Sequence, residues 1–194
     1  MPAKTSREAA PVVTLEEVLA RSGARDRTNV EKHLAACEAE PDQNHAKLWR
    51  RVASKLASFA PLPVQTVGLQ AVLFFIPDGK YRMQVFALED KNDGVVQLYL
   101  PDVLAQATKA KIIQKATGDE YAVVGAKDQT FTIESLDATN TSDPPPHIKN
   151  MIGWNRKAIR IALKTTDATG QQAKAAEAMI TLAAAKWATA KAAN

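Results

Sequence analysis

The chain has 194 residues with a hydrophobic fraction of 46% and a formal net charge of +4, which is the composition of a globular protein with a core. No apolar run approaches the roughly 20 residues that span a bilayer, and the N-terminus lacks the pattern of a signal peptide, so we expect no membrane contact. Cys37 is the only cysteine, which excludes an intramolecular disulfide and favours a cytoplasmic location.

The chain divides by composition into a tail and two structured parts. Residues 1–13 are polar and interrupted by prolines, so we predict a flexible tail. Residues 14–60 predict a helical N-terminal region and residues 64–194 an α+β domain, with a boundary at Pro61-Leu62-Pro63. The alternative is one continuous domain that includes both parts.

Three helices are predicted in the N-terminal region. Thr14-Leu15-Glu16-Glu17 has the form of a capping box, and the helix that follows it should end near Gly23. Thr28-Asn29-Val30-Glu31 has the same form and predicts a second helix that ends at about Glu40. A third helix is predicted over residues 42–59, because its apolar residues recur with the spacing of one helical face.

The rest of the chain alternates short apolar segments with turn residues, which predicts strands. The expected strands are Val67–Ile76, Tyr81–Leu88, Val95–Leu100, Ile112–Ile113, Tyr121–Val124, Phe131–Leu136 and Ala158–Lys164. Helices are expected over Asp102–Ala110, Pro146–Ile152 and the Ala-rich segment Gln171–Ala192. We therefore predict an α+β fold: a mostly antiparallel sheet of about six to seven strands, with N-terminal helices and an Ala-rich C-terminal helix covering one face.

Three side chains of the N-terminal region are of the types that bind zinc. His33 and Cys37 are four residues apart on the second predicted helix, so they share a face, and His45 could supply a third zinc ligand after a short loop. The sequence shows no fourth ligand and no CxxC pair, so we predict no metal and no cofactor and interpret Cys37 as a buried thiol. A nucleophilic role for Cys37 is disfavoured near the C-terminal end of a helix.

Acidic residues gather after the second predicted strand. Glu89 and Asp90 adjoin a predicted turn that contains Asp93, so these three carboxylates could approach one another. Calcium and magnesium need a denser set of oxygen ligands. His147 could act as a general base, but neither a carboxylate nor a nucleophile is fixed beside it in sequence. The sequence therefore predicts no catalytic residue.

Basic residues form two groups, in a chain whose C-terminal quarter is distinctly basic. One group follows the third predicted helix and the other surrounds a tryptophan, which suits contacts with nucleic-acid phosphates and bases. The candidate nucleic-acid-binding residues are Lys47, Arg50, Arg51, Lys55, Trp154, Arg156, Lys157 and Arg160. A solvated helix face and a tryptophan at the core edge are the simpler interpretation of the same residues.

Nucleotide-binding and hydrolase motifs such as GxxxxGK[ST], GxGxxG, GxSxG and HExxH are absent from the sequence. We therefore expect a non-catalytic binding protein that engages a protein partner or a second copy of itself. Two alternatives remain open. One is a nucleic-acid-binding protein that uses the basic residues above, and the other is a small-molecule-binding domain or enzyme with a pocket between sheet and helices.

Overall fold

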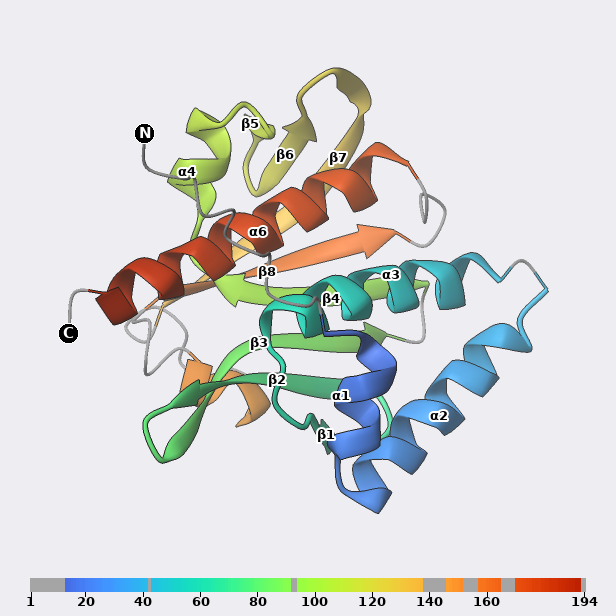
Figure 1. The fold of residues 1–194 in the computed structure, drawn as a ribbon. Coiled ribbons are helices and arrows are strands. Elements are labelled where there is room, and N and C mark those ends of the chain that lie inside the picture. The colour runs from blue at the N-terminus through green and yellow to red at the C-terminus, as the bar shows by residue number, and fades with distance from the viewer. Residues whose placement is uncertain are drawn as a thin grey trace, which may run out of the picture.

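The computed structural model describes residues 13–41, 43–91, 94–137, 146–151, 157–164 and 170–192. Most of the expected tail lies outside this range, as do Asp93, Trp154 and Arg156. The expected α+β class is confirmed: helices precede, interrupt and follow a single antiparallel sheet (Figure 1). The sheet has eight strands in the described residues, against the six to seven expected.

The sheet is built from two runs of neighbouring strands joined through one late strand. Its spatial order is β1-β2-β3-β4-β8-β7-β6-β5, and every pairing is antiparallel. The strands are β1 (Gln65–Val67), β2 (Ala71–Asp78), β3 (Tyr81–Lys91), β4 (Val95–Pro101), β5 (Ile113–Thr117), β6 (Glu120–Val123), β7 (Ala126–Asp137) and β8 (Lys157–Lys164). Strand β8 lies between β4 and β7, and so joins the two runs at the centre of the sheet.

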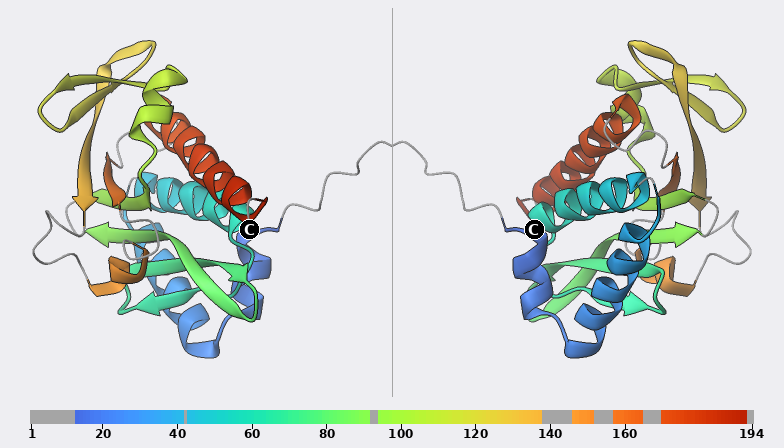
Figure 2. Two further views of the ribbon diagram at one scale, coloured as in Figure 1. Left: turned by 90° about the vertical axis from the view of Figure 1, so that its left-hand side faces the viewer. Right: turned by 90° about the vertical axis from the view of Figure 1, so that its right-hand side faces the viewer.

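The long helices α3 (Asn44–Phe59) and α6 (Gln171–Ala192) lie together on one face of the sheet (Figure 2). Helices α1 (Leu15–Arg21) and α2 (Ala24–Glu38) pack beside α3, and the short α4 (Leu104–Lys109) follows β4. On the opposite face the 3₁₀ helix η1 (Pro146–Ile148) is followed by helical residues 149–151, and Ile152 of the expected helix lies outside the described residues. Helix α6 has the bounds expected from its alanine-rich sequence.

The capping box before α1 is confirmed. The Thr14 hydroxyl accepts from the Glu17 amide at 3.2 Å, and the Glu17 carboxylate accepts from the Thr14 amide at 2.9 Å. The second box was wrong, because α2 already begins at Ala24 and Thr28 lies inside it. Asn29, a member of that box, donates instead to the hydroxyl of Thr66 at 2.9 Å.

The expected strand over residues 67–76 is also wrong, because a turn divides it into β1 and β2. Gly68 has a φ of +64°, a conformation that favours glycine and ends β1. A tight reversal at this point lets β1 pair back onto β2, with Val67 opposite Ala71. The remaining strands overlap the expected ones, although β3 and β7 are longer and β5 shares only Ile113 with the expected strand Ile112–Ile113.

One cluster of buried apolar side chains joins the N-terminal helices, the sheet and α6. It includes the fully buried Trp49 of α3, Leu98 of β4 and Ile180 of α6. A smaller cluster on the opposite face includes Tyr99 and Ile148. The division of the chain at residues 61–63 stays a prediction. Among the described residues, no helix combines the length and the apolar content needed to cross a bilayer.

Candidate metal centre

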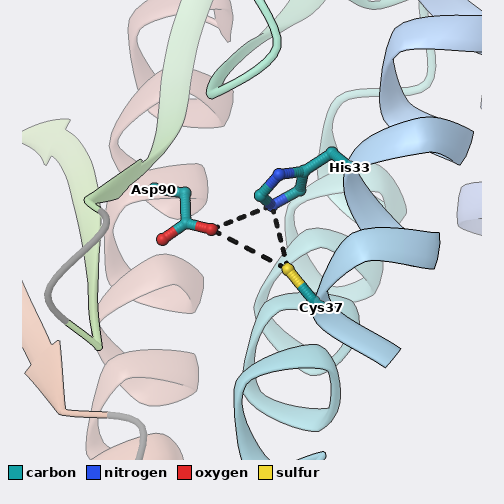
Figure 3. Close-up of side chains that lie close together, drawn as sticks. All are labelled: His33, Cys37 and Asp90. Atoms are coloured by element: carbon teal, nitrogen blue, oxygen red, sulfur yellow. Dashed lines mark hydrogen bonds and ion pairs between the residues drawn. The ribbon is translucent and has the colours of Figure 1, made fainter. Parts of the chain in front are cut away.

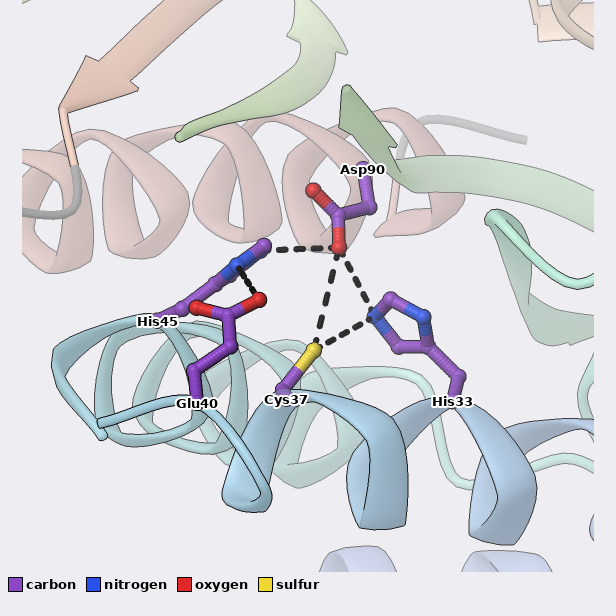
Figure 4. A network of polar contacts seen from close by, with 5 residues as sticks. All are labelled: His33, Cys37, Glu40, His45 and Asp90. Atoms are coloured by element: carbon purple, nitrogen blue, oxygen red, sulfur yellow. Dashed lines mark hydrogen bonds and ion pairs between the residues drawn. The ribbon is translucent and has the colours of Figure 1, made fainter. Parts of the chain in front are cut away.

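Four buried side chains with metal-binding atoms meet where the N-terminal helices reach the end of β3. They are His33 and Cys37 from α2, His45 from α3 and Asp90 from β3 (Figures 3 and 4). The side chains of His33, His45 and Asp90 are 9%, 8% and 6% exposed, and Cys37 is 3% exposed. Buried polar groups of this kind are costly unless each has a partner.

The local structure explains how each group arrives there. The spacing of four in α2 places His33 and Cys37 one turn apart on the same face, and the His33 ring rests against Trp49 with centroids 5.4 Å apart. His45 lies in the first turn of α3. Asp90 follows Leu88 by two residues in β3, so strand alternation turns it toward the helix layer.

The interatomic distances converge on the carboxylate of Asp90. Its Oδ2 lies 2.8 Å from His45 Nε2, 3.1 Å from His33 Nε2 and 3.9 Å from Cys37 Sγ. Cys37 Sγ lies 3.6 Å from His33 Nε2. One ligand atom each from His33, Cys37 and Asp90 lie within 4.8 Å of one another, and the same holds for Cys37, Glu40 and His45. Cys37 belongs to both sets.

These separations resemble the edges of a tetrahedral zinc site. Zinc bonds of roughly 2.0–2.2 Å to nitrogen and oxygen and roughly 2.3 Å to sulfur place the ligand atoms roughly 3.3–3.6 Å apart. The four observed separations run from 2.8 to 3.9 Å and lie on both sides of that range. Side-chain shifts of about half an ångström would adjust these four of the six edges, which is less than a change of rotamer requires.

The contact between His45 and Asp90 is short, yet it is not a hydrogen bond. His45 Nε2 and Asp90 Oδ2 are 2.8 Å apart, but an N–H at Nε2 would not point at that oxygen. His45 Nε2 and Asp90 Oδ1 have no hydrogen-bond partner, although both are buried. The other ring nitrogen, His45 Nδ1, lies 3.2 Å from Glu40 Oε1. With the proton on Nδ1, Nε2 carries a lone pair close to the carboxylate, and a cation bound near both atoms would offset their mutual repulsion.

In the metal-free chain the thiol of Cys37 is protonated at neutral pH. Burial, followed by the negative charges of Asp90 and Glu40, raises the pKa of Cys37 from 9.0 to about 12. Such a thiol is a poor nucleophile. A divalent cation beside the sulfur reverses this electrostatic balance, because a coordinating thiol is deprotonated outright.

A nucleophile–histidine–acid triad does not fit the same atoms. In such a triad the acid holds one ring nitrogen while the nucleophile contacts the other. Here Cys37 Sγ and Asp90 Oδ2 both approach Nε2 of His33. The arrangement suits side chains that surround a shared ion better than it suits proton transfer from a nucleophile through a histidine to an acid.

The cluster lines a hollow of about 410 Å³ whose wall is formed by His33, Ala36, Cys37, Glu40, His45, Asp90 and Gly94. The hollow gives an ion a route to the donor atoms. Glu40 stands at its outer side with a side chain that is 46% exposed. A second hollow of about 320 Å³, between the end of α3, β2, β3 and α6, has an apolar wall that includes Phe59 and Trp187. That wall offers no comparable donor set.

Sequence reasoning identified His33, Cys37 and His45 as possible ligands but missed Asp90 as their partner. Asp90 was grouped with Glu89 and Asp93, yet Glu89 points to the opposite face, where it accepts from the Tyr99 hydroxyl at 2.7 Å. The alternation of β3 was the available signal, because it places Asp90 on the same face as Leu88. His147 lies near that second group, with Nε2 3.6 Å from Glu89 Oε2.

The predicted nucleic-acid residues do not form one surface among the described residues. Arg160 faces away from the helix layer, paired with Glu134 and beside Tyr99, whereas the basic line of α3 lies on the helix side. On α3, Arg50 pairs with Glu38 and Arg51 with Glu177. Lys55 Nζ lies 5.0 Å from the centre of the Phe59 ring, and Lys157 Nζ lies 3.6 Å from the carboxylate of Asp137. The side chain of Lys47 is exposed. Binding of nucleic acid by these residues stays a prediction.

No protein-family model, curated protein sequence or solved structure matches this chain, so the chemistry of the His33–Cys37–His45–Asp90 cluster has to carry the functional argument.

Proposed function

We propose that the chain binds a divalent transition-metal ion, with zinc as the best fit, through His33, Cys37 and Asp90. The observation that carries the proposal is the convergence of three different donor atoms within 4.8 Å of one another at a buried position. Hydrogen bonding within the cluster leaves Oδ1 of Asp90 without a partner. A cation supplies the positive charge that the two histidines lack when neutral.

The donor set restricts which metal would bind. Thiolate and imidazole ligands favour zinc, cobalt or ferrous iron, whereas calcium and magnesium take oxygen ligands almost exclusively. The thiolate of Cys37 and the carboxylate of Asp90 together balance the charge of a divalent ion. The site therefore suits zinc and excludes the alkaline-earth ions on the chemistry of its ligands.

The function that this site supports is a metal-stabilised tertiary contact. Asp90 is 53 residues from Cys37 in sequence, and an ion shared between them ties α2 to the end of β3. Beside this contact, the amide of Asp90 donates to the carbonyl of Gln70 at 2.8 Å, so the strand end is already fixed to the β1–β2 turn. Binding to the folded chain alone raises stability by roughly 2.7 kcal/mol when free metal is 100 times its Kd.

The test is metal content and affinity of the purified full chain. After removal of metal with a chelator, the wild type should take up one zinc or cobalt ion per chain, measured by elemental analysis and titration calorimetry. The cobalt form should show the ultraviolet charge-transfer band of a cobalt–thiolate bond, and Cys37→Ala should abolish it. Asp90→Asn should weaken metal binding by more than about 100-fold. This exceeds the loss typical of a residue that contacts a metal ligand without contacting the metal itself.

Asp78→Asn is the matched control, because Asp78 ends β2 outside the cluster and should leave metal affinity unchanged. Thermal unfolding with and without zinc gives an independent readout, since only a chain with an intact site should be stabilised. Equal metal affinity in the wild type, Cys37→Ala and Asp90→Asn would refute the proposal. The expected binding of a protein partner or of a second copy remains a separate prediction.

A further inference from the structure

We propose that His45 completes the coordination of this ion as a fourth ligand, through Nε2, and that Glu40 is the residue that positions His45. The inference rests on the metal site proposed above and adds two residues to it. It converts a three-ligand site with an open position into a closed, four-ligand site. Closed tetrahedral sites are the form that structural zinc takes in proteins.

The first argument is the contact of His45 with Asp90. Nε2 lies 2.8 Å from Oδ2, inside the distance of a hydrogen bond, while the ring is turned so that no N–H lies on the line between them. Two electron-rich atoms so close together repel each other when nothing positive lies between or beside them. An ion bound by Asp90 would turn this repulsive pair into two ligands of one coordination sphere.

The second argument is the hydrogen bond on the other side of the ring. Glu40 Oε1 lies 3.2 Å from His45 Nδ1, and a carboxylate in this place holds the proton on Nδ1 (Figure 4). Metal-ligating histidines almost always donate their second ring nitrogen in this way, which fixes the tautomer and raises the basicity of the ligating nitrogen. The Glu40–His45 pair therefore has the form of an oriented ligand.

The third argument is the position of the sulfur. Cys37 lies within 4.8 Å of the ligand atoms of His33 and Asp90, and within the same distance of those of His45 and Glu40. Cys37 therefore links the two groups, although His45 and Asp90 do not fall in one set with it, so the His45 ring has to move toward the sulfur for Nε2 to reach an ion bonded to Sγ. His45 approaches it from α3, while His33 and Cys37 come from α2, so closure of the site would connect the two helices as well as the strand.

Glu40 and Glu38 provide a matched pair for the test. Their side chains are 46% and 47% exposed, and they are two residues apart, but Glu38 contacts Arg50 while Glu40 contacts His45. Glu40→Ala should lower zinc affinity by about 10- to 100-fold, the loss typical of an outer partner of a metal ligand. Glu38→Ala removes the same charge from the same region and should change affinity by less than about twofold.

His45→Gly tests the ligand itself by chemical rescue. With cobalt bound, the variant should lose the intense visible spectrum of a four-coordinate site, and added imidazole should restore it by filling the vacant position. Glu40 is exposed and lies outside the helices, between α2 and α3, so Glu40→Ala keeps the test decisive where His45→Gly fails to fold. Both readouts report coordination and do not depend on any catalytic activity.

The outcomes separate this inference from the proposed function. Wild-type affinity and an unchanged cobalt spectrum in Glu40→Ala and His45→Gly would overturn the role of His45, while metal binding through Cys37 would stand. Equal losses in Glu40→Ala and Glu38→Ala would also overturn it, because general electrostatics would then explain both. A wild-type chain that binds no metal would overturn both proposals together.

Discussion

The protonated thiol of Cys37 predicts that the metal-free chain loses stability in mildly alkaline solution. Burial and neighbouring carboxylates raise the pKa of Cys37 from 9.0 to about 12 in the folded chain. Above pH 9 the unfolded chain releases this proton while the folded chain retains it. Unfolding then becomes more favourable, so the stabilising contribution is complete below pH 9 and is lost as the pH rises toward 12.

The magnitude follows from these two pKa values. At pH 10 the linkage relation gives a loss of about 1.4 kcal/mol, and at pH 8 a loss of less than about 0.1 kcal/mol. The result is insensitive to the folded value, since a pKa of about 11 for Cys37 changes the loss by less than about 0.1 kcal/mol. For a chain of this length the loss corresponds to a fall in Tm of roughly 3–6 °C.

The assay is urea unfolding at pH 8 and pH 10, with a chelator present, for the wild type and for Cys37→Ala. Other groups titrate in this range, so the quantity to compare is the difference between the two proteins. The free energy of unfolding should fall by about 1.4 kcal/mol more in the wild type. Equal pH dependence of the two proteins would contradict the reasoning. With zinc bound the sign should reverse, because protons at low pH then compete with the ion for the sulfur.

Two further predictions concern the helices that carry the site. Gln43, which precedes α3, has a φ of 49° and makes no side-chain capping bond. Gln43→Gly should therefore raise the free energy of unfolding in urea by roughly 0.5–1 kcal/mol, while Gln43→Ala should not. A glycine variant that is less stable than the wild type would show that the backbone at residue 43 is not strained. Arg51 makes two contacts with Glu177, at 2.9 and 2.7 Å, and a double-mutant cycle should give this pair a coupling energy of roughly 1 kcal/mol. The more exposed Arg50–Glu38 pair should give less than roughly 0.5 kcal/mol. Equal coupling energies would contradict the role assigned to burial.

The elements that the sequence predicted well are those governed by local preferences. The Ala-rich segment 171–192 has no competing breaker, and its small residues face the core, where Ala173, Ala176, Ile180 and Ala183 are fully buried. Likewise, β8 alternates as expected, with Ile159 and Ile161 buried in the main cluster beneath the helices. In both cases periodicity alone was sufficient.

The errors arose where distant residues override local signals. The start of α2 was misplaced because the capping-box pattern at Thr28 lies inside a helix that begins at Ala24, where Asp26 and Asn29 bond to Thr66, about 40 residues away. Asp90 was missed as a member of the cluster for a similar reason, because spacing along the chain cannot show that a strand end meets a helix. His33, Cys37 and His45 could be grouped from the sequence because they lie close together on two adjacent helices, although the sequence led to a prediction of no metal.

The position of β8 at the centre of the sheet has a consequence for synthesis of the protein. Strands β1 to β4 and β5 to β7 can each pair with neighbours as soon as they emerge from the ribosome, but among the described strands the two groups share no ladder before residues 157–164 appear. A nascent chain arrested before this point exposes the backbone edge of β4 and the apolar faces that α6 later covers. Truncated products should therefore aggregate, and completion of the fold depends on the last strand to be made.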